Sequence, residues 1–428
     1  MKVLMVADLY PPLIGGTEQY VQNLARELVH RGHDVAVATM RPSGTPRTEV
    51  DEFGVRVYRI DQSWALRVRG AYGSGRPHHP SVADPGVTAA LRTITAAERP
   101  DVVYAQNWML YSYLAAAGRQ VDLPVLACLH DYWPICPARS LFSGERTCRH
   151  DTLSATVRCA VRHYGPAKGV ALGLGLWDAR KRWHHRVDRY LAVSAFVADA
   201  CQPALADRPV FVVPTCVSSD LVSVAANTPA PDFLPDRPYL LYVGRLRTAK
   251  GVTVLADAYR QLGPSAPPLL VLGAGESDCD VRWPANVRVV RDVPHDQVMA
   301  AWRDALVGVI PSTYPEPFGQ VAIEAMATGT PVVATAVGGL AEVVGRYPGG
   351  TLVPSGSPTA LAETLRRALN DPEPRVRAQE AGPAAAAPFF VSNVAESVEY
   401  HLTEVVAKHG RLPRPRFRGI PRSACRGN

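Results

Sequence analysis

The feature that most constrains the fold is an alternation of short β-branched runs with amphipathic stretches, which occurs twice along the chain. Short apolar runs bounded by turn residues are typical of buried strands. The first half predicts such strands at 3–7, 35–39, 55–60, 102–105, 125–129, 190–193 and 210–213. Because parallel strands need a long crossover, usually a helix, strands that alternate with helices predict a parallel, doubly wound sheet.

A predicted helix lies between the first two of these strands. Tyr20, Leu24 and Leu28 recur at helical spacing and form one apolar face. Thr17 is a residue type that caps helix starts, and Gly32 is a residue type that ends helices. The apolar face indicates that this helix packs on the sheet, as a crossover between parallel strands does.

A second strand pattern begins after a break in composition. Residues 217–238 contain Ser, Asn, Asp and four prolines, which is typical of a linker. Strands are then predicted at 239–243, 269–272, 287–290, 307–310, 331–334 and 351–353. The pattern predicts an α/β protein with two tandem Rossmann-like domains and a cleft between the carboxyl ends of their strands, where such sheets bind ligands.

The domain boundaries follow from these two patterns. The first domain is predicted at 1–216, the linker at 217–238 and the second domain at 239–390. A final helix is predicted at 391–410, and a basic tail follows at 411–428. At 428 residues, the chain is long enough for two ordinary domains.

The charge of the chain is concentrated at its end. The formal net charge of +7 equals the charge of Lys408 and the six arginines of 409–428, so residues 1–407 are formally neutral. We therefore expect no nucleic-acid partner, because nucleic-acid-binding domains carry their excess charge on a folded surface. A Pro-rich basic tail is typical of a solvated end, and peripheral contact with an anionic membrane is the alternative.

The chain start and the apolar segments bear on location. The apolar run before Pro11 and Pro12 is too short for a signal peptide. The apolar segment 169–177 is far shorter than the roughly 20 residues that span a bilayer. We therefore expect a cytoplasmic protein, which the basic tail would allow to sit at the inner membrane face.

Cysteine usage leaves one metal question open. Eight cysteines in a long chain without a signal peptide are expected to be reduced thiols. Cys136, Cys148, Cys159 and His163 fall within 28 residues and are of the types that bind zinc. Their spacing is loose and contains no CxxC pair, so the sequence assigns no metal ligand and leaves a structural zinc open.

The turn from the first strand to the first helix is rich in glycine. It reads YPPLIGGTE, and Gly15 and Gly16 allow the backbone to approach a ligand closely. The helix amino terminus behind them favours an anion. The dinucleotide motif GxGxxG is absent, which argues against a nicotinamide enzyme.

Two cations follow the first strand of the second domain. The segment VGRLRTAKG contains Arg245 and Lys250, which are expected at the ligand-binding edge of the sheet. A diphosphate leaving group needs its developing negative charge offset, and two fixed cations can do this without a metal. The alternative for this segment alone is a pair of exposed cations on a loop.

The segment PEPFGQVAIEAMATG is the most specific motif of the chain. Pro315 and Pro317 favour an extended loop, and a helix is predicted to begin near Gly319. Glu316 lies on this loop, and Glu324 lies within the helix. Two carboxylates so placed suit hydrogen bonds to the vicinal hydroxyls of a sugar and of a ribose. A solvated helix position is the alternative for Glu324, although its neighbours are apolar.

With these motifs, the chain resembles the large retaining glycosyltransferase family that includes sucrose-phosphate synthases and bacterial mannosyltransferases. This family is family 4 of the sequence classification, also called group 1. The E-x7-E pair of Glu316 and Glu324 carries most of the resemblance, and GRLRTAK, the pair His130–Asp131 and the segment VGGLAE at 337–342 stand in the expected order. The resemblance extends to about Lys408 and implies the GT-B fold, with a terminal helix that crosses back to the first domain.

The resemblance also implies roles for these residues. Arg245 and Lys250 would bind the donor diphosphate, Glu316 would meet the hydroxyls of the transferred sugar, and His130 would sit near its reacting carbon. Glu324 would bind the nucleotide ribose. The remaining donor contacts would come from backbone groups near the diphosphate and the base, at Gly15, Gly16, Phe318, Gly319, Gln320 and Val293. Asp292 departs from the family, where a glycine is common.

A nucleoside diphosphate sugar, linked to UDP or GDP, is the implied donor, and neither a cofactor nor a divalent metal is expected. The acceptor stays open between a natural-product or aminocyclitol core, a glycan and a lipid-linked molecule. The basic segment 180–186 suits a phosphorylated or lipid-linked acceptor, or is a solvated cationic face. The surface loop predicted at 62–86 and the segment 132–165 match no motif. The competing functions are a nucleotide-sugar epimerase of the same fold and an inactive nucleotide-sugar-binding module.

Overall fold

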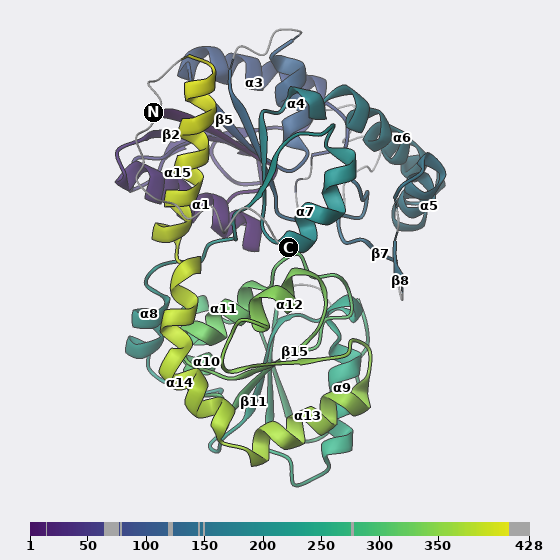
Figure 1. Ribbon diagram of the computed structural model, residues 1–428, viewed down its shortest axis with the longest axis vertical. Helices are drawn as coiled ribbons and strands as arrows, with labels where there is room; N and C mark the ends of the chain where they lie inside the picture. Colours follow the sequence, from purple (N-terminus) through teal and green to yellow (C-terminus); the bar gives the residue numbers. More distant parts are fainter. Residues whose placement is uncertain are drawn as a thin grey trace. The chain divides into compact units, whose positions relative to one another are not determined.

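The computed structural model describes residues 1–13, 15–63, 77, 79–118, 123–143, 146–148, 150–274 and 278–410. The chain forms two compact units, drawn as ribbons in Figure 1. Unit 1 comprises Met1–Leu141, Cys148–Cys216 and Val391–Asn428, and unit 2 comprises Phe142–Thr147 and Val217–Phe390. Most of the surface loop expected at 62–86, and the whole basic tail expected at 411–428, lie outside the described residues.

Unit 1 contains an eight-stranded sheet in the order β10-β9-β6-β5-β1-β2-β4-β3. All its strand pairs are parallel except β3–β4 at the edge. The strands are β1 (Lys2–Ala7), β2 (Asp34–Met40), β3 (Thr48–Val50), β4 (Arg56–Ile60), β5 (Val102–Gln106), β6 (Val125–Leu129), β9 (Arg189–Ala192) and β10 (Val210–Val212). The seven predicted strands are confirmed, and the short edge strand β3 was not predicted.

The central strands of this sheet are apolar along their whole length. β5 and β6 are buried at every residue, and β1 is buried at all but its first. Strands buried on both faces are typical of parallel sheets covered by helices. The strand order reverses between β1 and β5, and ligands bind such sheets at the carboxyl ends of the strands beside this reversal.

Helices cover the sheet of unit 1. Its helices are α1 (Gly16–His30), α3 (Pro85–Glu98), α4 (Met109–Ala116), α5 (Leu153–Tyr164), α6 (Pro166–Arg182), α7 (Ala195–Cys201) and α15 (Val391–Lys408). The apolar face predicted for α1 is buried, with Tyr20, Leu24 and Leu28 in the core. The predicted cap is wrong: α1 begins at Gly16 and its N-cap is Gly15, so Thr17 lies inside the helix.

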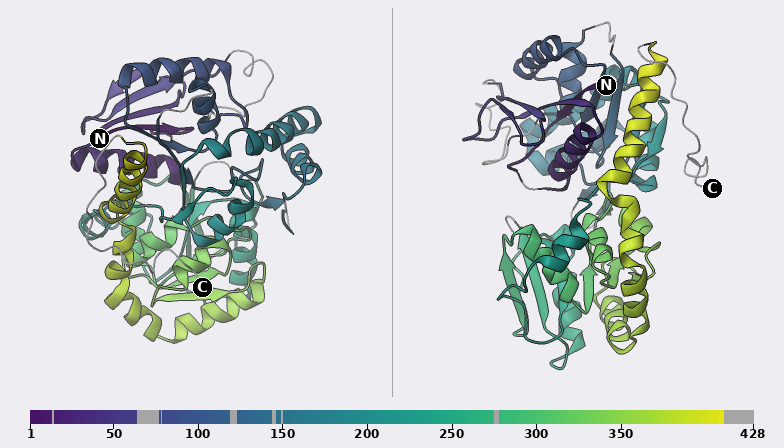
Figure 2. Two further views of the ribbon diagram at one scale, coloured as in Figure 1. Left: turned by 45° about the horizontal axis from the view of Figure 1, so that its top comes forward. Right: turned by 90° about the vertical axis from the view of Figure 1, so that its left-hand side faces the viewer.

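The last helix belongs to the first unit. α15, drawn in yellow, lies beside α1 in Figures 1 and 2. Glu399 of α15 pairs with Arg31 at 3.3 Å and lies 3.0 Å from His33. Val394, Val398 and Leu402 are buried against unit 1. The chain therefore returns to its amino-terminal unit after unit 2, as the resemblance implied.

Unit 2 contains a six-stranded parallel sheet in the order β13-β12-β11-β14-β15-β16. Its strands are β11 (Leu240–Arg245), β12 (Leu269–Ala274), β13 (Val287–Arg291), β14 (Val307–Ile310), β15 (Val332–Thr335) and β16 (Gly350–Val353). All six were predicted. Counted in chain order, the arrangement is 3-2-1-4-5-6, the order of dinucleotide-binding sheets, and it reverses between β11 and β14.

The helices of unit 2 are α8 (Leu221–Asn227), α9 (Val252–Leu262), α10 (His295–Asp304), α11 (Gln320–Ala327), α12 (Gly338–Val344), α13 (Pro358–Asn370) and α14 (Glu373–Ala386). α8 lies within the segment whose composition predicts a linker. α9 and α13 pack on one face of the sheet, where Tyr242, Leu255 and Leu365 share one apolar core. A small hairpin, β7 (Phe142–Ser143) with β8 (Arg146–Thr147), is grouped with this unit. Among the helices described here, none combines the length and the apolar character needed to cross a bilayer.

Candidate active site

Two loops of unit 2 meet at the point where its strand order reverses. Arg245 ends β11, and a short 3-10 turn at Thr248–Lys250 follows it. Gly251 has φ 73°, and a Cβ there would lie 1.8 Å from the carbonyl oxygen of Pro311, which follows β14. The Thr313 amide also donates to the Ala249 carbonyl at 2.9 Å. Glycine is therefore required where the two loops touch.

This contact brings Lys250 to Glu316. The ammonium of Lys250 donates to one oxygen of the Glu316 carboxylate, and the Ser312 hydroxyl donates to the other at 2.5 Å. The ammonium also lies 5.2 Å from the ring centroid of Tyr314. Only 6% of Glu316 is exposed. The sequence indicated Lys250 and Glu316, whereas Ser312 and Tyr314 carry no motif of their own and were missed.

Both members of this pair are charged. Burial raises the pKa of Glu316, but the neighbouring Lys250 outweighs burial and holds that pKa below its usual value. Burial likewise lowers the pKa of Lys250, and Glu316 outweighs it and raises that pKa. Burial raises the pKa of Tyr314 to about 12, so its hydroxyl stays protonated. The site therefore presents a fixed cation and a fixed anion side by side.

Arg245 differs from Lys250 in its surroundings. In the described part of the chain, no carboxylate lies within ion-pair distance of its guanidinium. Burial lowers its pKa, and the nearby Arg247 adds to the effect. An arginine remains a cation nonetheless. A half-buried cation that no carboxylate of the described residues neutralises favours an anionic ligand, because such a ligand would supply the counter-charge.

The start of α11 lies beside the same loop. Gly319 is its N-cap with φ 106°, and a Cβ there would lie 2.6 Å from the Leu340 side chain. The Gly339 amide donates to the Glu316 carbonyl at 2.8 Å, and Gly338 leaves no room for a Cβ against that same carbonyl. The VGGLAE motif therefore supports the backbone of Glu316, and α11 begins two residues after Phe318.

Glu324 occupies a separate part of unit 2. His295 Nε2 lies 3.0 Å from one carboxylate oxygen, and Trp302 Nε1 donates to the other at 3.2 Å. Glu324 is buried, so the alternative of a solvated helix position is wrong. The hydrogen bond with Glu324 raises the pKa of His295. No motif of the sequence indicates His295 or Trp302 as partners of Glu324, because both lie more than twenty residues away from it.

The turn that contains Val293 lies next to Glu324. His295 begins α10, directly after Val293 and Pro294. Asp292 has φ 53°, the left-handed conformation in which glycine is favoured. This explains why a glycine is common at this position in the family that the sequence resembles. The turn and Glu324 are thereby linked through His295.

His130 lies at the carboxyl edge of the sheet of unit 1. It follows β6, and its Nε2 lies 2.6 Å from the side-chain oxygen of Gln106, the last residue of β5. The ring of Tyr20 meets the imidazole edge-on at 4.5 Å. Burial, with a smaller contribution from Arg139, lowers the pKa of His130 to about 3, so the ring is neutral.

Two further polar residues stand at the reversal point of this sheet and were not found from the sequence. Asp8 follows β1 and accepts from the Met109 amide at 2.7 Å. Burial raises the pKa of Asp8 to about 7, although Arg139 opposes it. Asn107 has φ 61°, and both polar atoms of its buried side chain lack partners among the described residues. A positive φ and unpaired polar atoms at one residue are typical of a functional site.

Gly15 and Gly16 stand at the start of α1. A Cβ on Gly15 would lie 2.5 Å from the carboxylate of Glu18, which is buried. A carboxylate of the chain itself is therefore close to the helix amino end, where the sequence indicated room for an anion. Ile14, the residue before these glycines, lies outside the described residues.

The basic segment 180–186 does not join His130. Arg182, Trp183 and Arg186 line a cavity of about 750 Å³ together with His409. Asp188, which precedes β9, and Gly118, which follows α4, line it too, so it lies at the amino edge of the sheet. His130 is at the opposite edge.

Comparison with known proteins gives the chain a family. The family model for Glycosyltransferase Family 4 matches residues 14–221, and the model for Glycosyl transferases group 1 matches residues 226–385. A glycogen synthase from Mycobacterium tuberculosis is 29% identical, with 97% of this chain and 98% of the relative covered. A 2-deoxystreptamine N-acetyl-D-glucosaminyltransferase from Streptomyces fradiae is 28% identical over 84% of both chains.

Solved structures agree on the fold. Sucrose-phosphate synthase from Thermosynechococcus elongatus superposes with a TM-score of 0.72 at 21% identity, covering 95% of this chain and all of the neighbour. Anabaena HepE, solved in complex with UDP-glucose, gives 0.67 at 19% identity over 94% of this chain and all of the neighbour. The sheets of both units and the family models lead to one conclusion: the chain is an enzyme of the group 1, family 4 glycosyltransferases, with the GT-B fold.

Proposed function

We propose that this glycosyltransferase moves a sugar from a nucleoside diphosphate sugar, with UDP or GDP as the nucleotide, to a hydroxyl of a polyhydroxylated acceptor, with retention of anomeric configuration and without a divalent metal. One observation carries the proposal. Where its strand order reverses, unit 2 holds Arg245, which no carboxylate of the described residues neutralises, and the Lys250–Glu316 pair. Cations at this edge of such a sheet suit a diphosphate.

The proposed chemistry follows from the charges of the reaction. As the bond between the anomeric carbon and the diphosphate breaks, the diphosphate gains negative charge and the carbon becomes cation-like. Arg245 and Lys250 offset the first change, and Glu316 holds the sugar hydroxyls and partly offsets the second. The acceptor oxygen bonds to the same carbon on the face that the diphosphate leaves, and its proton passes to a departing phosphate oxygen.

The remaining residues are assigned to donor binding. Glu324 binds the ribose hydroxyls, and the turn at Val293 lies against the base. The amides of Phe318, Gly319 and Gln320 bind the sugar and the phosphates.

Unit 1 is assigned to the acceptor, and three of its residues complete the proposed machinery. His130 acts as a neutral imidazole toward a sugar hydroxyl, which its lowered pKa supports. Gly15 and Gly16 contribute backbone to the diphosphate.

The proposed acceptor class rests on the relatives. Their names refer to glycogen, to 2-deoxystreptamine and, for further relatives, to inositol 3-phosphate. 2-Deoxystreptamine and inositol 3-phosphate are rings that carry several hydroxyls, and glycogen is a polymer of such rings. A cyclitol, an aminocyclitol or the end of a glycan is therefore the first acceptor class to test, before a lipid-linked one.

A donor panel tests the donor and separates the competing functions. UDP- and GDP-sugars are first ranked by thermal shift, since a ligand that binds the native state raises the melting temperature. The bound donor is then incubated with and without cyclitol and glycan acceptors. Transfer or slow hydrolysis supports the proposal, and NMR of the product must give the anomeric configuration of the donor. A new nucleotide sugar would indicate an epimerase, binding without turnover an inactive module, and an inverted product would overturn retention.

Metal independence needs its own experiment. Turnover is measured in EDTA and after addition of magnesium or manganese. We expect equal rates, because Arg245 and Lys250 take the role that magnesium has in other transferases. Loss of turnover in EDTA that magnesium or manganese restores would contradict this part of the proposal.

A further inference from the structure

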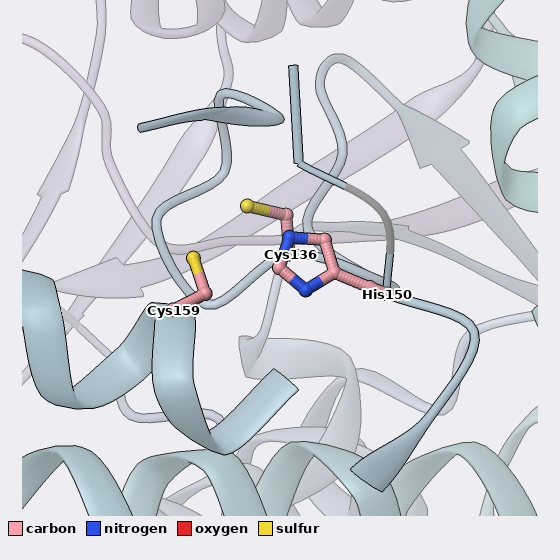
Figure 3. A group of neighbouring side chains, drawn as sticks. All are labelled: Cys136, His150 and Cys159. Carbon is pink, nitrogen blue, oxygen red and sulfur yellow. The ribbon is translucent and has the colours of Figure 1, made fainter. Parts of the chain in front are cut away.

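Three side chains of metal-binding type meet in unit 1, away from the residues assigned to the reaction. They are Cys136, His150 and Cys159, and their ligand atoms all lie within 4.8 Å of one another. Figure 3 shows the two sulfurs and the imidazole ring turned toward one another, with Cys159 on a helix. Cys159 belongs to α5, His150 precedes that helix, and Cys136 lies in the loop after β6.

A fourth side chain adjoins this group. Cys148 forms a hydrogen bond with Cys159 and is half-buried. Its amide donates to the Leu141 carbonyl at 2.7 Å, which fixes its backbone beside the loop of Cys136. The sequence left open a set with His163 as its histidine, whereas the structure brings His150 to the cysteines. His163 lies one turn beyond Cys159 on α5 and is exposed, whereas His150 reaches the sulfurs.

His150 is the observation that points to a ligand. Both of its ring nitrogens are buried, and neither has a hydrogen-bond partner in the described part of the chain. Leaving a buried polar group unsatisfied costs free energy. A metal ion bound at one nitrogen would remove this cost.

The backbone around the four residues is held in place by other groups. Arg180 of α6 donates to the carbonyls of Pro134, at 3.1 Å, and Ile135, the two residues before Cys136. The same guanidinium donates to the His150 carbonyl at 2.8 Å. A single side chain thus fixes two of the three segments that supply ligands. Such outer contacts orient ligands in metal sites.

We propose that Cys136, Cys148, His150 and Cys159 bind one Zn²⁺ ion as a structural site. Three sulfurs and one imidazole nitrogen form a common structural zinc set, with four protein ligands and no open position. Zn–S bonds of about 2.3 Å and Zn–N bonds of about 2.0–2.1 Å place tetrahedral ligand atoms about 3.5–3.8 Å apart, within the 4.8 Å limit of the cluster.

The ion would connect α5 to the loop that leaves β6. That loop begins with His130 and Asp131, and Arg139 within it pairs with Asp131 at 2.7 Å. Cys136 stands between them. The metal would therefore hold the loop behind His130 in place, and it takes no part in the proposed transfer chemistry. Zinc content and transferase activity are separate measurements, so failure of one proposal leaves the other standing.

The test begins with the metal content of the full chain, purified under reducing conditions without chelators. We expect one zinc per chain. X-ray absorption at the zinc edge should give a sulfur shell at about 2.3 Å and a nitrogen at about 2.0–2.1 Å. Less than about a tenth of an equivalent after incubation with zinc, a shell of oxygen and nitrogen alone, or a Cys136–Cys159 disulfide found by mass spectrometry would overturn the proposal.

Variants identify the ligands. His150→Ala and Cys159→Ser should lose the stoichiometric zinc, whereas the matched controls His163→Ala and Cys216→Ser should keep it. Cys216 is also a buried cysteine of unit 1, but it lies outside the cluster. If His150→Ala fails to fold, the wild-type absorption spectrum still decides. Zinc kept in His150→Ala and lost in His163→Ala would contradict the ligand set.

Discussion

Arg245 and Lys250 carry the same charge, but replacing each of them with a neutral residue should affect stability differently. Lys250 neutralises the buried Glu316, so its loss leaves a carboxylate without its counter-charge and lowers stability as well as activity. Arg245 has no carboxylate partner within the described residues. Its loss should therefore weaken anion binding and activity and leave the stability of the free protein unchanged. Arg245 is therefore the better probe of catalysis.

We predict that Arg245→Ala lowers kcat by about 100–1000-fold, the effect of about 2.7–4 kcal/mol that one preorganised charge partner has at such sites. The melting temperature without donor should stay near that of the wild type. Arg247→Ala is the matched control, because Arg247 is exposed on the same loop. Steady-state kinetics with the best donor measure the effect. A near-normal kcat in Arg245→Ala would contradict the role of the cation.

Substitutions of Glu316 and Glu324 should change different kinetic constants. Glu316→Gln should depress kcat strongly, because it removes the charge that balances Lys250 and the sugar. Glu324→Gln should mainly raise the donor KM, since the proposed ribose contact is made equally in the ground state and the transition state. Both kinetic constants are compared in each variant, and thermal melting controls for folding. A loss confined to kcat in Glu324→Gln would reverse this assignment.

Asp8 predicts an unusual pH dependence. Burial raises its pKa from 3.8 to about 7, so the folded state holds a proton that the unfolded state releases above about pH 4. The carboxyl therefore lowers stability as pH rises from 4 to 7, and the whole penalty is present above 7. Asp8→Asn should raise the melting temperature clearly more at pH 8 than at pH 5, where only part of the penalty is present. An equal shift at both values would contradict the raised pKa.

Secondary structure elements were predictable where their sequence pattern is local. Runs such as 125–129 are apolar at every position, and the buried strand β6 has these same bounds. The edge strand β3 was missed because its three residues alternate in exposure and carry no apolar run. The N-cap of α1 was missed because Gly15 has no side chain and therefore cannot make a side-chain capping hydrogen bond.

The candidate site shows the same division. Arg245, Lys250, Glu316 and Glu324 belong to continuous motifs, so the sequence indicates them as candidates. Ser312, His295 and His150 act through partners that the fold brings near. For His150, three segments of unit 1 must meet before its role is visible, whereas His163 only has the more regular spacing from Cys159.

The last helix is an element whose packing can be tested. Leu402 lies on the face of α15 that packs on unit 1, and it is fully buried. Leu402→Ala should lower the free energy of unfolding by about 2–5 kcal/mol, the usual cost of a buried leucine. Glu396→Ala, at an exposed position of the same helix, is the control. Denaturant unfolding measures both, and an unchanged midpoint in Leu402→Ala would contradict the packing of α15.

Across the whole molecule, the two units differ in how they respond to acid. Unit 1 contains four histidines whose pKa burial lowers, to about 4 for one and about 3 for the others: His79, His130, His184 and His401. They stay neutral when folded and bind protons when unfolded below about pH 6.5. Unit 2 contains a single histidine, His295, whose pKa is raised by its hydrogen bond with Glu324. Its contribution is present below pH 6.5 and is lost as pH rises through its raised pKa.

We predict that acid destabilises unit 1 first. Near pH 5 the unfolded state binds up to four more protons at these four histidines than the folded state does. At Asp8, which is still protonated when folded, the folded state instead binds about one proton more. Three net protons correspond to a loss of about 4 kcal/mol per pH unit between pH 6 and 5. Calorimetry at pH 7, 6 and 5 should show one transition falling steeply and one nearly constant, and limited proteolysis should assign the first to unit 1.

His401→Gln keeps an acceptor for Arg189 but cannot titrate, so it should reduce the slope by about 1.4 kcal/mol per pH unit, whereas the exposed His30→Gln should not. Equal shifts of both transitions, or a slope unchanged in His401→Gln, would show that the buried histidines do not govern the acid response.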